Sequence, residues 1–213
     1  MMKNLICSLV LLIACQISFG QEKEITISEK RVANRLMLFA VNENLVDLDV
    51  KMSVEGTGFR QSKSKPRLVR VPATSKVHML NLMVTKGMQP VYSANITSSD
   101  SLSRRALRKP AEKIKIDPPM RLTVYITENC MTCDTIMSQL HASPYRFIEH
   151  ILAEKPNIKE QIGKAFIGAS TPMSDVKNPI FSIESSVYIN IETYEELMDK
   201  LYGREEEEEE VKE

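Results

Sequence analysis

The sequence predicts two folded domains of different class, an antiparallel β domain followed by an α/β domain. The first observation is a series of short runs in which apolar and polar residues alternate, such as LDVKMSV (48–54) and KVHMLNLMV (76–84). The second is a change after residue 119 to runs with helical spacing that alternate with apolar strands. The third is the intervening segment, 100–119, whose basic residues and prolines predict a linker.

The first twenty residues, 1–20, predict an exported chain. A positively charged start is followed by the apolar run LICSLVLLIAC (5–15), and small residues precede a cleavage site after Gly20, as in a secretory signal peptide. The alternative is a bacterial lipoprotein, in which Cys15 of the stretch LIAC is lipidated. The predicted location is therefore periplasmic or secreted, and attachment to a membrane is expected only if Cys15 carries a lipid.

Residues 21–99 are expected to form an antiparallel β-sandwich, because short strands follow one another at close spacing. This segment resembles the immunoglobulin-like modules that precede catalytic domains in secreted bacterial proteins. His78 stands alone on an alternating strand, so we expect it to be a packed or surface residue. The chain has 28 basic and 28 acidic residues, and this balance gives no reason to expect a nucleic-acid partner.

Over residues 120–203 the pattern predicts the element order βαβαββα. The strands are expected over 120–127, 145–152, 179–183 and 187–191, and the helices over 131–142, 156–168 and 193–202. Thr193 and Glu196 have the spacing of a capping box at the start of the last helix. The remaining residues, 204–213, contain six consecutive glutamates and predict a disordered acidic tail.

Removal of the leader leaves two cysteines, Cys130 and Cys133, in the stretch ENCMTCDT (128–135). A disulfide between them closes a very short loop and therefore adds little as a structural staple. Two thiolates can also bind Cu(I), which stays an alternative. Zinc needs two further ligands, and the nearby candidates, His141 and His150, lack ligand spacing to the pair. We therefore expect no metal site, and Cu(I) binding by the two cysteines remains the alternative.

The position of the pair between the first strand and the first helix resembles the thioredoxin superfamily, and most closely its glutaredoxin-like branch. The resemblance covers residues 120–203 and depends on VYITENCMTC (124–133), the Asn178-Pro179 step before a strand, and the closing hairpin and helix. It implies a thiol–disulfide oxidoreductase in which Pro179 is cis and faces the cysteines. Asn178, Pro179, Met131 and Thr132 would then shape the groove that holds the substrate.

The chemistry assigns different roles to the two cysteines. A helix N-terminus lowers the pKa of a thiol, so Cys130, expected at the helix start, is the predicted nucleophile, and Cys133, one turn on, would resolve the mixed disulfide. The expected partners are disulfide-containing protein substrates and an electron donor or acceptor that the sequence does not identify. Glu128 and Asp134, beside the pair, are expected to oppose formation of the thiolate.

The chain departs from the glutaredoxin pattern at three places. The family has proline after the first cysteine, a basic residue before the pair and Gly-Gly before the last helix, whereas this chain has Met131, residues 127–129 (TEN) and residues 190–192 (NIE). These departures argue against a dedicated glutathione enzyme, so no cofactor is expected beyond the redox-active disulfide. The alternative function is a binding protein in which the Cys130–Cys133 disulfide is locked and the fold is a scaffold.

Overall fold

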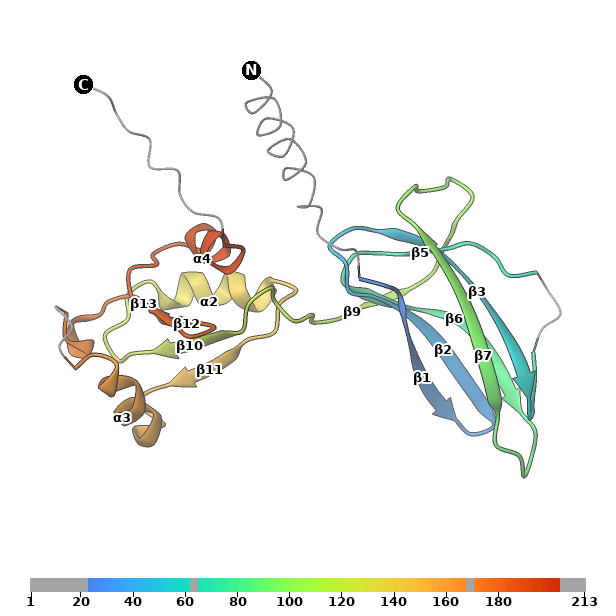
Figure 1. Cartoon of the computed structure of the whole chain (residues 1–213), viewed down its shortest axis with the longest axis horizontal. Coiled ribbons are helices and arrows are strands. Elements are labelled where there is room, and N and C mark those ends of the chain that lie inside the picture. The colour runs from blue at the N-terminus through green and yellow to red at the C-terminus, as the bar shows by residue number, and fades with distance from the viewer. Residues whose placement is uncertain (1–22, 62–64, 168–170, 204–213) are drawn as a thin grey trace, which may run out of the picture. The chain divides into compact units, whose positions relative to one another are not determined.

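The computed structural model describes residues 23–61, 65–167 and 171–203. The chain divides into two compact units, Met1–Lys113 and Ile114–Glu213, called here the N-terminal and C-terminal units. Within the described residues there are three small β-sheets and three α-helices, so the protein is rich in β structure (Figure 1). The expected leader (1–20), which includes Cys7 and Cys15, and the expected acidic tail (204–213) lie outside the described residues.

The N-terminal unit holds two of the sheets. In the first sheet the strand order is β1-β2-β6-β4, and β9 also pairs with β6. Its strands are β1 (Thr26–Val32), β2 (Arg35–Asn42), β4 (Phe59–Arg60), β6 (Ser75–Val84) and β9 (Ala111–Lys113). The second sheet has the order β7-β3-β5-β8. Its strands are β3 (Leu48–Thr57), β5 (Val69–Val71), β7 (Val91–Ser99) and β8 (Leu107–Arg108).

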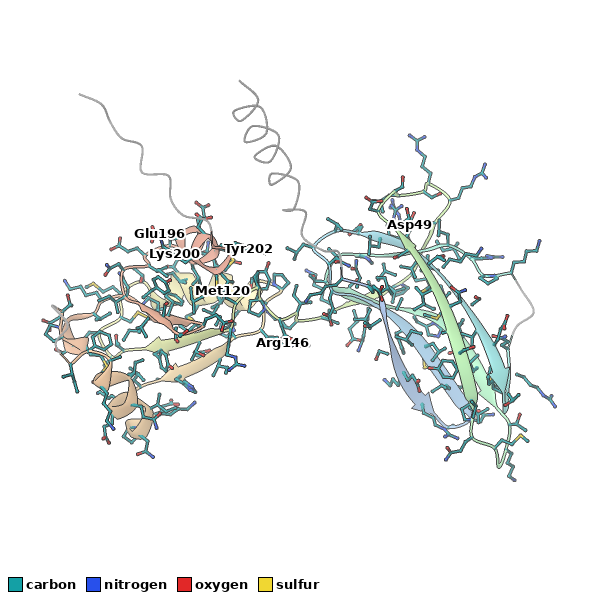
Figure 2. All side chains as sticks on the ribbon, in the orientation of Figure 1. Asp49, Met120, Arg146, Glu196, Lys200 and Tyr202 are labelled. Carbon is teal, nitrogen blue, oxygen red and sulfur yellow. A yellow bond between two sulfur atoms is a disulfide. The ribbon has the colours of Figure 1, made fainter. Side chains whose placement is uncertain are left out.

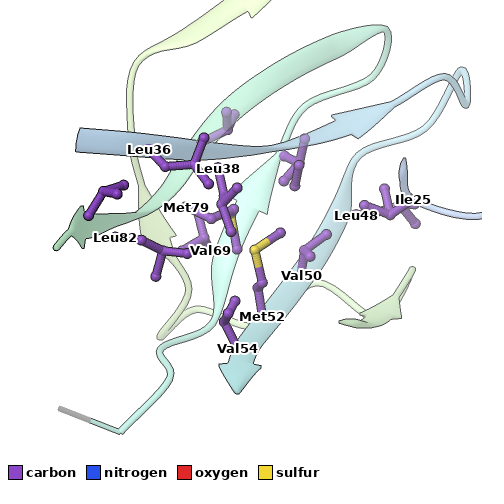
Figure 3. Close-up of a cluster of buried hydrophobic side chains, with 14 residues drawn as sticks. Ile25, Leu36, Leu38, Leu48, Val50, Met52, Val54, Val69, Met79 and Leu82 are labelled. Atoms are coloured by element: carbon purple, nitrogen blue, oxygen red, sulfur yellow. The ribbon is translucent and has the colours of Figure 1, made fainter. Parts of the chain in front are cut away.

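The alternating sequence pattern explains how these sheets pack. In β2, every second residue is buried, so its apolar side chains point to one face of the sheet. β3 and β6 alternate in a similar way, except that Asp49 of β3 is also buried and the alternation in β6 shifts by one residue after Met79. The buried side chains of both sheets form one apolar cluster (Figure 3). All strand pairs of this unit are antiparallel except the short β5–β8 pair, which is parallel.

The segment 100–119, expected to be a linker, contains structure that belongs to the N-terminal unit. Strands β8 and β9 lie within it and pair with β5 and β6. Ser103 donates its backbone N–H to the buried carboxylate of Asp49 on β3 (Figure 2). The expectation of a linker is therefore wrong for this part of the segment. Its side chains are mostly exposed, as the basic residues and Pro110 suggested, but its backbone pairs with the edges of both sheets.

The C-terminal unit has the element order βαβαββα that the sequence predicts. Its elements are β10 (Leu122–Ile126), α2 (Cys133–Ala142), β11 (Ile148–Ile151), α3 (Pro156–Lys164), β12 (Ile180–Ile183), β13 (Ser186–Tyr188) and α4 (Tyr194–Leu201), with a 3₁₀ turn at Met173–Asp175. The strand order in the sheet is β11-β10-β12-β13. Strand β10 is parallel to β11 and antiparallel to β12, and β12 is antiparallel to β13.

Helices α2 and α4 cover one face of this sheet, and α3 lies on the other side (Figure 1). Buried residues of α2 and α4 share one cluster with β10 and β12. At the start of α4, the Thr193 hydroxyl accepts the backbone N–H of Glu196 at 3.2 Å, which confirms the predicted N-cap. The Glu196 carboxylate accepts the backbone N–H of Glu192 at 2.9 Å. No helix in the described part of the chain is long and apolar enough to cross a membrane.

Candidate functional site

The two cysteines lie between the end of β10 and the start of α2 and are joined by a disulfide. Their Cα atoms are 5.7 Å apart, within the range that a disulfide requires. Cys133 is buried, with 6% of its surface exposed, whereas Cys130 is only partly buried. Because a sulfur must be reached in line to be attacked, this difference in exposure favours Cys130 as the reacting residue.

The helix begins later than the sequence suggests. Cys133, not Cys130, is the first residue of α2, and Thr132 is its N-cap. Cys130 therefore lies in the loop, although its sulfur is bonded to the first residue of the helix. The first N–H groups of a helix lack partners within the helix and carry the positive end of its dipole. Either sulfur, once reduced to a thiolate, would gain from this position.

The loop that carries Cys130 is bound to a segment that lies more than forty residues further along the chain. Four hydrogen bonds run from this loop to residues 174–178. They are Thr127 Oγ1 to Val176 O (3.4 Å), Asn129 Nδ2 to Ser174 O (3.2 Å), Met131 N to Lys177 O (2.7 Å) and Thr132 Oγ1 to Asn178 Oδ1 (3.1 Å). The Thr132 hydroxyl thus donates to Asn178 and forms no side-chain cap on α2. The first backbone N–H groups of α2 therefore receive no hydrogen bond from the N-cap side chain.

Pro179 differs from the expectation drawn from the resemblance. Among the described residues no peptide bond is cis, so the Asn178–Pro179 bond is trans, and the expected cis proline is wrong. The trans form is the one that an X–Pro bond adopts unless its surroundings impose the cis form. Pro179 is buried directly before β12, and the residue that lines the groove beside the cysteines is its neighbour Asn178.

A groove of about 390 Å³ lies beside the cysteine pair. Three residues that the sequence indicated line it: Met131, Thr132 and Asn178. Met131 is 76% exposed, so an apolar side chain stands in solvent between the two cysteines. Sequence reasoning missed the other lining residues, which are Thr171, Asp175, Val176, Lys177, Ile189, Asn190 and Glu192. They come from the segment before β12 and the loop after β13. Residues 190–192 of that loop stood out in the sequence only because they replace the Gly-Gly of glutaredoxins.

Glu128, expected to oppose the thiolate, has a partner. Lys159 on α3 donates to its carboxylate at 2.8 Å. This hydrogen bond, together with the charge of Lys159, lowers the pKa of Glu128 below its ordinary value, so its carboxylate stays ionised. The pair brings one positive and one negative charge to the loop two residues before Cys130. The expected electrostatic penalty from Glu128 is therefore offset, whereas Asp134 remains in the first turn of α2.

The two histidines of this unit have other partners. His141 lies 3.3 Å from the Glu149 carboxylate and against the Phe147 ring, and His150 contacts the Lys155 ammonium at 3.0 Å. Burial and the charge of Lys155 lower the pKa of His150. Within the described residues there is no cluster of three or more histidine, cysteine or acidic side chains that could hold a metal ion. The structure thus places neither histidine in a shared cluster with the cysteines.

Comparison with known proteins adds no relative. A scan against protein-family models, a search of curated proteins and a search of solved structures each returned no significant match to this chain.

Proposed function

We propose that this protein is an exported thiol–disulfide oxidoreductase that acts through Cys130 and Cys133. The observation that carries the proposal is the asymmetry of the pair: a partly exposed Cys130 is bonded to a buried Cys133 at the N-terminus of α2, beside a groove. A nucleophilic thiol needs access to its substrate, and a resolving thiol needs only access to the first sulfur. The arrangement meets both requirements.

The topology of the C-terminal unit supports a thioredoxin-superfamily fold of the glutaredoxin-like kind. Strand β10 lies next to a parallel β11 and an antiparallel β12, β13 lies at the far edge, and the cysteines follow β10. The trans bond before Pro179 is a departure from that family. For the N-terminal unit we propose an immunoglobulin-like sandwich, supported by two sheets that share one apolar cluster.

The proposed reduction of a substrate proceeds in two exchanges. The Cys130 thiolate attacks one sulfur of the substrate disulfide; the new S–S bond forms as the substrate bond breaks, and the departing substrate thiolate takes a proton. The Cys133 thiolate then attacks the Cys130 sulfur and releases the second substrate thiol. The substrate gains two electrons, the Cys130–Cys133 pair loses two, and oxidation of a substrate follows the same steps in reverse.

The location and partners follow from the same chemistry. The predicted leader would direct the chain out of the cytosol and into a compartment in which disulfides persist. Lipidation at Cys15 is the alternative to simple cleavage of the leader. Disulfide-containing protein substrates would lie in the groove beside Met131, Thr132 and Asn178. Turnover also needs a donor or acceptor of two electrons that returns the pair to its starting state.

A second candidate is a binding protein whose disulfide is locked. One observation favours it: the four hydrogen bonds that hold the Cys130 loop to residues 174–178. A loop held in this way keeps the two sulfurs at bonding distance. This stabilises the disulfide relative to the dithiol, because less freedom is lost on closure.

A redox titration of the mature chain, residues 21–213, separates the two candidates. The chain is equilibrated in graded dithiol buffers, and alkylation with mass readout reports the fraction of reduced Cys130 and Cys133. A reversible midpoint between about −120 and −270 mV supports the oxidoreductase, whereas a midpoint below about −300 mV supports a locked disulfide. Cys133→Ser should trap mixed disulfides with substrates, and Cys130→Ser is its matched control. If Cys130→Ser retains the reductase activity of the parent, the assignment fails.

A further inference from the structure

The N-terminal unit contains a hollow of about 570 Å³ where both of its sheets have open edges. On one edge of β6, β9 pairs with residues 75–77 and β4 with residues 83–84, so residues 78–82 have no described neighbouring strand on that side. In the facing sheet, β5 pairs with β3 only at residues 48–50, and the described strands leave the rest of that edge of β3 open.

The charged groups around this hollow are all cationic. Lys65, Arg67 and Lys109 line it, and the described residues of its lining include no aspartate or glutamate. None of the ion pairs between described residues involves these three side chains. Its lining also includes apolar residues, among them Met52 and Val54, which are almost fully buried and belong to the apolar cluster of this unit (Figure 3). We call this region the basic hollow.

Lys109 is held at the inner side of the basic hollow. Its ammonium donates to the carbonyl oxygens of His78 (3.0 Å) and Met79 (2.9 Å). The pairing of β2 with β6 shifts register here: Leu38 pairs with Leu80 and Phe39 with His78, so Met79 is an extra residue in β6. Lys109 thus binds two consecutive carbonyl oxygens at this bulge.

Both of these partners of the Lys109 ammonium are neutral carbonyl oxygens, so neither supplies a negative charge. An ammonium has three N–H donors, and two of them are used by the carbonyls. Burial lowers the pKa of Lys109, as expected for a cation that has lost part of its hydration without gaining a carboxylate. An anion placed in the hollow would accept the third N–H and offset this desolvation.

We propose that the basic hollow binds a small organic anion, a molecule with a carboxylate, sulfonate, sulfate or phosphate head group and an apolar body. The head group would contact Lys109 and the exposed Lys65 and Arg67, and the body would lie on apolar lining residues that are not fully buried, Leu80 and Leu107. The volume falls within the range of about 300 to 1,000 Å³ that is usual for small-molecule sites. This proposal is independent of the chemistry at the cysteine pair.

The bulge argues against an extended peptide as the occupant. A peptide that adds to a sheet edge gains its affinity from backbone hydrogen bonds to that edge. At His78 and Met79 both carbonyl oxygens are already bound by Lys109, so an added strand would lose these partners or displace a partly buried ammonium. A compact anion instead uses the ammonium where it lies.

Fluorescence titration of the mature chain with 8-anilinonaphthalene-1-sulfonate, an aromatic sulfonate, tests the proposal. We expect one saturable site, displaced by octyl sulfate and not by octyl glucoside, which has the same apolar body without the charge. Displacement that is equally effective with octyl glucoside would overturn the proposal, because the site would then be an apolar patch. Amide chemical shifts on addition of octyl sulfate should change in β3 and β6, and changes elsewhere alone would also overturn it.

Two variants locate the charge contacts. Lys109→Met keeps the apolar stem and should weaken octyl sulfate binding about tenfold, the loss expected for one hydrogen bond to a charged group. Lys65→Ser/Arg67→Ser changes only exposed residues, so it should keep the fold, and it should weaken binding about threefold, as expected for exposed charges. The matched control is Lys30→Ser/Arg31→Ser on β1, expected to bind like the parent. If the second variant binds as tightly as this control, the proposal fails, even if Lys109→Met does not fold.

Discussion

The ion pair between Glu128 and Lys159 predicts that two single substitutions will change the acidity of Cys130 in opposite directions. The carboxylate and the ammonium are 2.8 Å apart, so their effects on a sulfur two residues away nearly cancel. Lys159→Met removes the positive charge, so the unpaired Glu128 carboxylate should raise the pKa of the reduced Cys130 thiol. Glu128→Gln removes the negative charge, so the unpaired Lys159 ammonium should lower that pKa. The double variant should resemble the parent.

The size of the effect follows from distance and exposure. Two residues of extended chain span about 7 Å, and we use this as the order of magnitude of the distance between the charge and the sulfur. The side chains of Lys159 and Glu128 are 46% and 59% exposed, so water screens the interaction strongly. A unit charge at this distance in a medium close to water changes an equilibrium about two- to threefold. Each single variant should therefore change the thiolate-to-thiol ratio of Cys130 at fixed pH by about that factor.

The assay is the pH dependence of iodoacetamide alkylation of Cys130 in the fully reduced mature chain, at low and at high salt. Lys164→Met is the matched control, because Lys164 also lies on α3 and pairs with a glutamate, Glu160, of that same helix. The opposite shifts should shrink at high salt. Shifts of the same sign in both single variants, or a shift in the control as large as theirs, would refute the electrostatic reasoning.

Three further predictions concern stability. Burial raises the pKa of Asp49, but hydrogen bonds from Arg70 and a backbone N–H outweigh it and hold that pKa below its usual value. The stability gained is thus present above about pH 4 and is lost as the pH falls through the folded-state pKa of Asp49. Asp49→Asn should therefore lower the free energy of unfolding by about 3 kcal/mol at pH 7 and by less at pH 3, as measured by urea unfolding. Gly56→Ala should cost about 2 kcal/mol in the same assay, because its Cβ would lie 2.1 Å from Val91 O; an unchanged midpoint would contradict this. Gly163→Ala in α3 meets no atom within 4 Å and should gain about 0.7 kcal/mol, seen as a higher melting temperature.

Local pattern was sufficient for most of the secondary structure. The alternating runs at 48–54 and 76–84 lie within β3 and β6, and Thr193 caps α4 as its spacing indicates. The linker expectation failed for residues 107–113 because β8 and β9 have only two and three residues, too few to show a period. Their place is set by pairing with β5 and β6, and such pairing between distant segments leaves no local signal.

The candidate site shows the same division between local and distant contacts. The spacing of Cys130 and Cys133 indicated a disulfide, and the structure contains it. The partner of Glu128 was missed because Lys159 lies 31 residues further along the chain. The helix start was placed two residues too early because the loop up to Thr132 is bound to residues 174–178, more than forty residues away. These contacts give the loop the hydrogen bonds that an earlier start of the helix would otherwise supply.

Two features of the site act on the redox equilibrium in opposite directions. The hydrogen bonds to residues 174–178 hold the loop in one conformation, and this lowers the entropy cost of closing the disulfide. None of these bonds involves a sulfur atom, so they act only through the distance that they impose. The N–H groups at the start of α2 act on the sulfur charge and stabilise a thiolate, hence the reduced state. Only contacts that differ between the oxidised and reduced states change the reduction potential. The pair can therefore cycle only if stabilisation of the thiolate offsets the stabilisation of the disulfide by the ordered loop.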